Sequence, residues 1–165
     1  MNFNPKPKPT KKAKGKPRKK KTPRQLAEIR LDAIVKQIVL DRDGGCVCPP
    51  PLDGVHKGGR TPGHLISRVK ESIKWDLLNV HEQCAACNSR HEYYPEIYTD
   101  WFIRNFGGGK YTALVERSYK VSKLTFDDLE TLEIELTEVQ KWQEQTGRKA
   151  YFTQRQLLSG EWRNV

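Results

Sequence analysis

Two short cysteine pairs constrain the fold of this chain more than any other feature. They are Cys46-x-Cys48 and Cys84-x-x-Cys87, and 35 residues separate them. Zinc takes four ligands at tetrahedral corners, and two cysteine pairs from separate loops are a common way to supply them. Four thiolates would fill the coordination shell and leave no place for a reactive water, so the spacing predicts a structural zinc ion. Reduced cysteines without metal are the alternative.

The composition suits a domain stabilised by a metal. Only 36% of the 165 residues are apolar, which is modest for a core, so a bound metal would help the chain to fold. No stretch has the length and apolarity of a transmembrane helix or the apolar centre of a secretory signal. We therefore expect a cytoplasmic protein, in which cysteines are more often metal ligands than disulfides.

All of the excess positive charge lies near the start of the chain. Residues 1–24 hold eleven of the thirty Lys and Arg residues and no acid, whereas the rest is close to neutral. Residues 1–21 are rich in Pro and poor in large apolar side chains, so we expect a disordered arm. The arm is either a solvated tail or a phosphate-binding segment, and an anionic membrane is a weaker option. Its candidate DNA-binding residues are Lys11, Lys12, Lys19, Lys20 and Lys21.

The remaining pattern predicts an α+β domain that is mainly helical. Two extended runs, residues 64–69 and 77–83, flank a polar turn and could pair as an antiparallel hairpin. Capping residues and helical spacing predict a helix that starts after Thr22 and stops near Asp43. We place the domain at residues 22–145 and an extension without a clear signal at 146–165. Further helices are expected from Pro95 to Gly107, from Tyr111 to Ser118 and from Thr125 to Gly147.

His64, Asn79 and Asn88 stand at a notable spacing around the second cysteine pair. The stretches "GHLISR", "NVHEQCAACN" and "YTDWFIRNFGGGKYTALVERS" contain or follow them. With these motifs the chain resembles the HNH family of nucleases and, more narrowly, the phage recombination endonucleases called NinG or Rap. The resemblance covers roughly residues 26–140.

This resemblance implies a zinc-stapled ββα-metal core, made of a hairpin and a helix, with flanking helices. It implies a metal-dependent endonuclease that hydrolyses DNA phosphodiester bonds on branched or recombining DNA. His64 would be the general base and Asn79 would hold its imidazole in the correct tautomer. Arg68, four residues further on the same expected strand, would bind the scissile phosphate.

The residue before the catalytic His is often a metal ligand in that family, but here it is Gly63. A catalytic Mg²⁺ or Mn²⁺ would therefore need ligands from a helix that starts near Cys87. At helical spacing, Asn88 and Glu92 share one side and His91 is close to it. His91 would shift the preference toward a transition metal. Further candidate DNA-binding residues in the domain are Lys70, Lys74 and Arg90.

Two other classes of function remain open. One is a zinc-stapled nucleic-acid binding protein without turnover, such as a regulator or packaging adaptor, which Gly63 and Asn88 together favour, since they are an absent and a weak metal ligand. The other is a host-interaction protein that uses its C-terminal helices. The expected partner is DNA, without a membrane, in the cytoplasm of a bacterial host if the chain is phage-encoded. Cutting two opposed strands of a junction would suit a homodimer.

Overall fold

A computed structural model describes residues 20–49 and 56–165 of the chain. Residues 1–19, and with them the predicted arm residues Lys11, Lys12 and Lys19, lie outside the described residues. The described fold is α+β and mainly helical, with one two-stranded antiparallel sheet. In the part of the chain that the structure describes, no helix is both long and apolar enough to cross a membrane.

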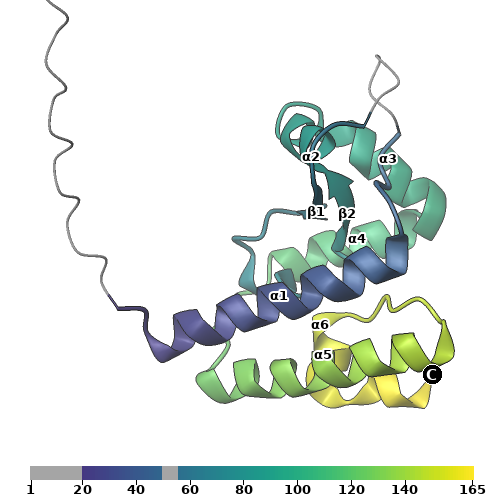
Figure 1. The fold of residues 1–165 in the computed structure, drawn as a ribbon. Coiled ribbons are helices and arrows are strands. Elements are labelled where there is room, and N and C mark those ends of the chain that lie inside the picture. The colour runs from purple at the N-terminus through teal and green to yellow at the C-terminus, as the bar shows by residue number, and fades with distance from the viewer. Residues whose placement is uncertain (1–19, 50–55) are drawn as a thin grey trace, which may run out of the picture.

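Two long helices form one layer of the protein. Helix α1 (Pro23–Asp43) begins at a Thr22 capping box with Pro at its first position, and Gly44 ends it with a φ of 68°. Helix α5 (Phe126–Thr146) begins at a Thr125 capping box and ends at Gly147 with a φ of 66°. Both match the expected helices. They pack side by side over a shared core (Figure 1).

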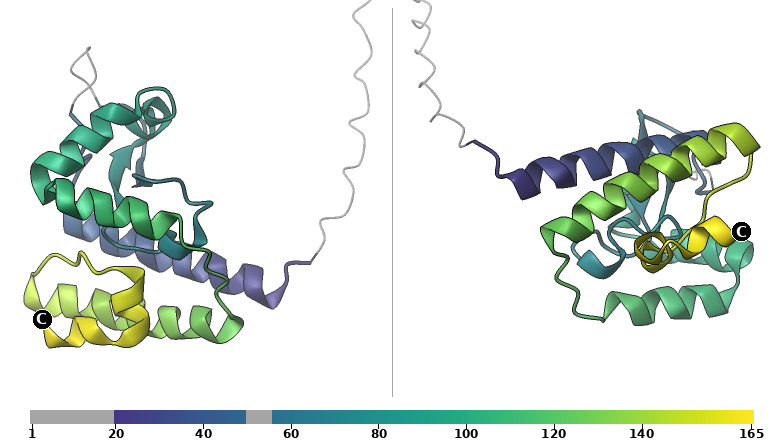
Figure 2. Two further views of the ribbon diagram at one scale, coloured as in Figure 1. Left: turned by 180° about the vertical axis from the view of Figure 1, so that it is seen from behind. Right: turned by 90° about the horizontal axis from the view of Figure 1, so that it is seen from below.

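The hairpin lies on the other side of α1 (Figures 1 and 2). Strand β1 (Arg60–His64) pairs antiparallel with β2 (Val80–Cys84), and His64 is opposite Val80. The expected first strand at residues 64–69 is therefore wrong in its position, because β1 ends at His64. The amide and carbonyl of Ile66 bond to the side chain of Asn79, which takes them out of a strand ladder. A loop with a short 3-10 turn, η1 (Glu71–Ile73), connects the strands.

Three helices cover the face of the hairpin that is turned away from α1. They are α2 (Ala85–His91), α3 (Pro95–Phe106) and α4 (Gly108–Ser118). Helix α2 follows β2 directly, and Gly107 ends α3 as expected, with a φ of 87°. Buried Tyr98, Phe102 and Leu114 pack with Leu65 and Leu78 of the hairpin region in a second core. This core holds α2 against the hairpin.

The C-terminal segment, which had no clear sequence signal, completes the α1–α5 core. It forms α6 (Gln154–Ser159) and a 3-10 turn, η2 (Glu161–Asn164). Its buried members are Ala150, Phe152, Leu157 and Trp162.

Arg42, near the end of α1, ties these parts together. Its buried guanidinium donates to the carbonyls of Leu77, Val80 and Ala150 at 2.7 to 2.9 Å and pairs with Asp43. An Arg with all of its donors bonded can be buried at low cost, whereas leaving those carbonyls unpaired would be expensive. Arg42 thereby joins α1, the hairpin and the C-terminal segment.

Candidate functional sites

A cluster of sulfur and nitrogen ligands lies where β2 meets α2. Cys84 ends β2 and caps α2, where its Sγ accepts a hydrogen bond from the Cys87 amide at 3.4 Å. Cys46 follows α1 in the chain, and His56 precedes β1. The ligand atoms of these four residues all lie within 4.8 Å of one another. Three thiols and one imidazole are a normal tetrahedral zinc set, so the cluster can bind a metal ion such as zinc.

The thiols of the cluster have unequal acidities. Burial alone would raise the pKa of Cys84, but hydrogen bonds from the Cys87 amide and from His56 outweigh it and bring the pKa to about 6. Burial, with the neighbouring Cys84 sulfur, raises the pKa of Cys87. The lowered pKa favours the thiolate form of Cys84, which is the form that binds a metal.

The expected set of four cysteines needs one correction. Cys48 does not belong to the cluster, and His56 takes the fourth place. The Sγ of Cys48 instead accepts a hydrogen bond from Nε2 of Gln83 at 2.8 Å. Burial raises the pKa of Cys48 to about 11, which keeps it a thiol. Two features of the sequence could have indicated this replacement of Cys48 by His56. They are the irregular spacing of the first cysteine pair and the presence of a His between the two pairs.

A second site, which we call the His64 hollow, lies beside the end of β1. It has a volume of about 440 Å³ and contains five of the predicted site residues. One comes from the end of β1, one from the loop after it, and three from α2 or its end. The five are His64, Arg68, Asn88, His91 and Glu92.

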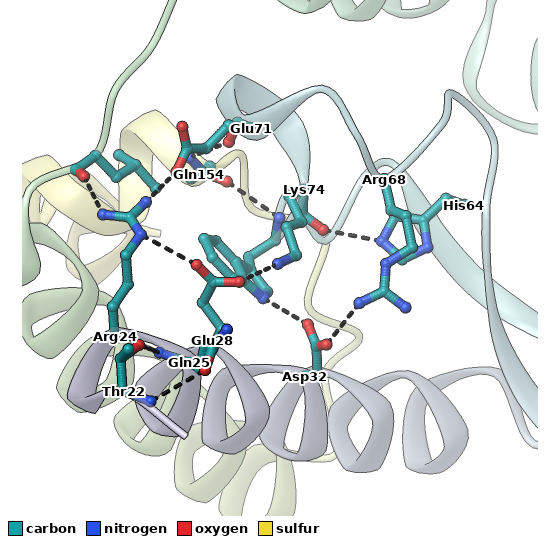
Figure 3. A network of polar contacts seen from close by, with 12 residues as sticks. Thr22, Arg24, Gln25, Glu28, Asp32, His64, Arg68, Glu71, Lys74 and Gln154 are labelled. Atoms are coloured by element: carbon teal, nitrogen blue, oxygen red, sulfur yellow. Dashed lines mark hydrogen bonds and ion pairs between the residues drawn. The ribbon is translucent and has the colours of Figure 1, made fainter. Parts of the chain in front are cut away.

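The imidazole of His64 is oriented by the main chain. Its Nε2 lies 3.0 Å from the carbonyl oxygen of Lys74 (Figure 3). A carbonyl only accepts, so Nε2 carries the hydrogen and Nδ1 keeps a free lone pair. Burial lowers the pKa of His64, the Lys74 carbonyl opposes this, and the charge of Arg68 adds to the lowering. His64 is thus neutral near pH 7 and can accept a proton.

Asn79 acts on the loop and not on the imidazole, which corrects the expected orienting role. Its side chain accepts from the Ile66 amide at 2.8 Å and donates to the carbonyls of Ile66 and Ile73. These three bonds hold both ends of the loop that carries Lys74. Asn79 is completely buried, so the bonds are shielded from water. It supports His64 through the position of Lys74.

The sequence predicted Arg68 on the first strand, but the structure places it beyond the end of β1. It still lines the His64 hollow, and its guanidinium pairs with Asp32 of α1 at 2.7 Å. Asp32 also accepts from the indole of Trp75, which is buried in the core. Lys74 pairs with Glu28 at 3.0 Å. Two candidate phosphate binders are therefore held by carboxylates of α1.

The other predicted phosphate binders have different surroundings. Lys20 and Lys21 line a neighbouring hollow together with Arg68 and Lys74. Arg90 donates to the Pro49 carbonyl at 3.2 Å, so its guanidinium has a main-chain partner. The side chain of Lys70 is over the exposed ring of Tyr119 at 5.6 Å.

The donors on α2 suit a divalent cation by their chemistry. Asn88 and Glu92 offer oxygen, and burial lowers the pKa of His91 so that it offers a neutral nitrogen. Mg²⁺ often keeps several waters and takes only one or two protein oxygens besides phosphate. Among the residues that the structure describes, the Cys46 cluster is the only group of three or more His, Cys, Asp or Glu whose ligand atoms converge. A catalytic ion would therefore depend on few protein ligands.

His81 lies on the opposite face of the hairpin from His64, because it pairs with Gly63 and side chains alternate along a strand. Its Nδ1 is 2.8 Å from the Tyr98 hydroxyl, and Nε2, surrounded by aromatic rings, has no partner among the residues that the structure describes. Burial and the nearby charge of Arg42 lower its pKa well below the ordinary value. His81 is a structural residue of the second core.

Comparisons with protein-family models, with curated proteins and with solved structures gave no match for this chain.

Proposed function

We propose that the protein is a metal-dependent endonuclease that hydrolyses DNA phosphodiester bonds in the His64 hollow. The observation that carries this is the state of His64, whose Nε2–H is used by the Lys74 carbonyl while Nδ1 is free to act as a base. The lowered pKa keeps that base unprotonated at neutral pH. A general base of this kind contributes about 10²- to 10⁴-fold to a rate.

In this proposal, a water beside Nδ1 of His64 attacks the phosphorus. A new P–O bond forms, the bond from phosphorus to one sugar oxygen breaks, and the proton of the water moves to Nδ1. The leaving oxygen takes a proton from solvent. Asn88, with His91 and Glu92, would hold Mg²⁺ or Mn²⁺, which would offset the charge of the phosphate.

Arg68 is the proposed phosphate ligand, and its present partner matters to that role. A carboxylate presents two oxygens to a guanidinium in much the same way as a phosphate does. Asp32 therefore holds Arg68 where an incoming phosphate could replace it. Both side chains are more than a third exposed, so the pair is weak and its exchange costs little.

Branched or recombining DNA as the substrate comes from the family resemblance alone. The basic residues give a different, sequence-independent contribution. Lys20 and Lys21, where the described chain begins, line a hollow that shares Arg68 with the His64 hollow. The basic residues before them would thus extend DNA-backbone contacts from the proposed active site.

A nucleic-acid binding protein without turnover is the second candidate. It is favoured by the carboxylate partners of Arg68 and Lys74 and by Gly63, which supplies no ligand. In that case the cysteine cluster and the basic surfaces would be retained, and the His64 hollow would have no chemical role.

One experiment separates the two. The purified protein is incubated with plasmid and four-way-junction DNA and with Mg²⁺ or Mn²⁺, beside His64→Ala and a charge control, Lys149→Gln. We expect cutting by the wild type and the control, and a loss of about 100-fold or more in His64→Ala. No cutting by the wild type, or equal cutting by His64→Ala, would overturn the nuclease proposal. DNA binding without cutting would support the second candidate.

A further inference from the structure

A basic hollow on another part of the surface has no role so far. It lies between η1, the connection from α4 to α5, and α6, and its volume is about 480 Å³. We call it the Arg117 hollow. Three cationic side chains and three hydroxyls line it, and no carboxylate among the described residues does. They are Arg117, Lys120, Arg155, Ser72, Ser122 and Ser159.

Two of the three cations of the Arg117 hollow, Lys120 and Arg155, have no carboxylate partner among the described residues. The third, Arg117, pairs with buried Asp76 at 3.0 Å, and its buried Nε has no hydrogen-bond partner in that part of the chain. Within residues 20–49 and 56–165, the exposed side chains of Lys120 and Arg155 form no ion pair or hydrogen bond. This differs from Arg68 and Lys74, which carboxylates neutralise. The hydroxyls of Ser72 and Ser159 already donate to the carbonyls of Arg117 and Gln156, so the unpaired cations are the groups suited to an anion such as phosphate.

One loop connects the Arg117 hollow to the His64 hollow. Arg68 lines the His64 hollow, Lys70 lies over Tyr119, and Ser72 lines the Arg117 hollow. The Cα atoms of Arg68 and Ser72 are at most about 14 Å apart, given the reach of an extended chain. That is about four steps of a nucleic-acid strand at 3.4 Å each. A single strand could therefore contact both hollows.

Two exposed side chains, one aromatic and one apolar, stand at or next to the Arg117 hollow, which Val121 lines and which Tyr119 precedes in the chain. Tyr119 is 76% exposed and Val121 is 93% exposed. Neither side chain packs in a core, so core packing does not account for Tyr119 and Val121 at these surface positions. An aromatic ring between cationic side chains is the usual arrangement for contact with a base of an unpaired strand.

We propose that the Arg117 hollow binds a backbone phosphate of the DNA strand that passes through the His64 hollow. Lys120 and Arg155 bind the phosphate, and Tyr119 lies against a neighbouring base. This deepens the proposed nuclease function and rests on it for the choice of DNA as the ligand. It also assigns a binding task to the C-terminal helix α6, which otherwise only completes the core.

The test measures binding apart from cutting. Full-length His64→Ala is the parent, and a short labelled single strand and a duplex are titrated in several salt concentrations without Mg²⁺ or Mn²⁺. Lys120→Gln and Arg155→Gln should each weaken binding about fivefold and lower the slope of log affinity against log salt by about one. Tyr119→Ala should weaken binding of the single strand more than that of the duplex.

Lys149→Gln is the matched control, because it removes one exposed charge in a different hollow. Thermal unfolding checks that each variant is folded. If Lys120→Gln and Arg155→Gln bind like Lys149→Gln, the Arg117 hollow is not a phosphate site, even when the wild type cuts DNA. If they show the expected losses while the wild type does not cut, the phosphate site stands and the nuclease proposal fails.

Discussion

The side chain of Gln83 fills the space that a side chain at Gly63 would need. A Cβ at Gly63 would collide with the terminal amide of Gln83, which reaches across the hairpin to donate to Cys48. Gly63 has no unusual backbone conformation, so space alone accounts for the glycine. Any side chain at position 63, an acidic metal ligand included, would therefore require Gln83 to move.

Gly63→Ala should destabilise the protein by about 1 to 3 kcal/mol, the usual cost of an overpacked site. The double variant Gly63→Ala with Gln83→Ala should lose less than the two single losses added together, because the second change removes the clash. Urea unfolding of the four proteins measures this coupling. Additive losses would mean that Gln83 can move away freely.

Metal content should separate His56 from Cys48. The wild type should bind about one zinc per chain, with His56→Ala and Cys46→Ala losing affinity because each removes a member of the cluster. Cys48→Ala should keep its zinc, since Cys48 lies outside the cluster and its Sγ accepts from Gln83. Native mass spectrometry in competition with a chelator measures the affinity. Zinc loss in Cys48→Ala, but not in His56→Ala, would contradict the assignment.

Stability should fall in acid because of buried His81. Its folded-state pKa lies well below the ordinary value, so below about pH 6.5 the unfolded chain binds a proton that the folded chain does not. The unfolding free energy should therefore decrease as pH falls, by up to about 1.4 kcal/mol per pH unit for one group.

His81→Gln should flatten this pH dependence, although it is expected to be less stable at pH 7. Part of the slope should remain, because the pKa values of His64 and His91 are lowered as well. Urea unfolding at several pH values gives the slopes, with zinc content measured at each, since acid also releases metal from thiolates. If the unfolding free energy of His81→Gln depended on pH as steeply as that of the wild type, His81 would not be the cause of the acid sensitivity.

Asp32→Asn should strengthen DNA binding by a few-fold. The change removes a negative charge beside the His64 hollow and releases Arg68, while the amide oxygen can still accept from the Trp75 indole. The cost in stability should be below about 1 kcal/mol because the ion pair is exposed. Fluorescence anisotropy in the His64→Ala background measures the affinity. Equal or weaker binding by Asp32→Asn would mean that Arg68 does not contact DNA.

The sequence predicted the long helices well because their limits are local. Each long helix begins at a capping Thr, Thr22 or Thr125, and ends at a Gly, and these caps depend only on residues close by in the sequence. The end of β1 was missed, since it depends on Asn79, which is distant in sequence from Ile66. The C-terminal segment was missed for a similar reason, because its few apolar residues find their partners on α1 and α5.

The sequence predicted which residues belong to the candidate sites better than it predicted the partners of those residues. Five proposed residues do line one hollow, but Arg68 has a carboxylate partner on α1 that no local pattern indicated. The fourth member of the cysteine cluster was also misplaced. Spacing favoured Cys48, whereas the fold turns that thiol toward Gln83 and brings His56 in.

His64 owes its tautomer to a peptide oxygen of residue 74, which every amino acid possesses. Replacing Lys74 would remove an ammonium group but not this acceptor, so an alanine scan would not detect it. The orientation of the His64 imidazole therefore does not depend on which amino acid stands at position 74. Only changes that move the loop, such as the loss of the Asn79 amide, would expose this dependence genetically.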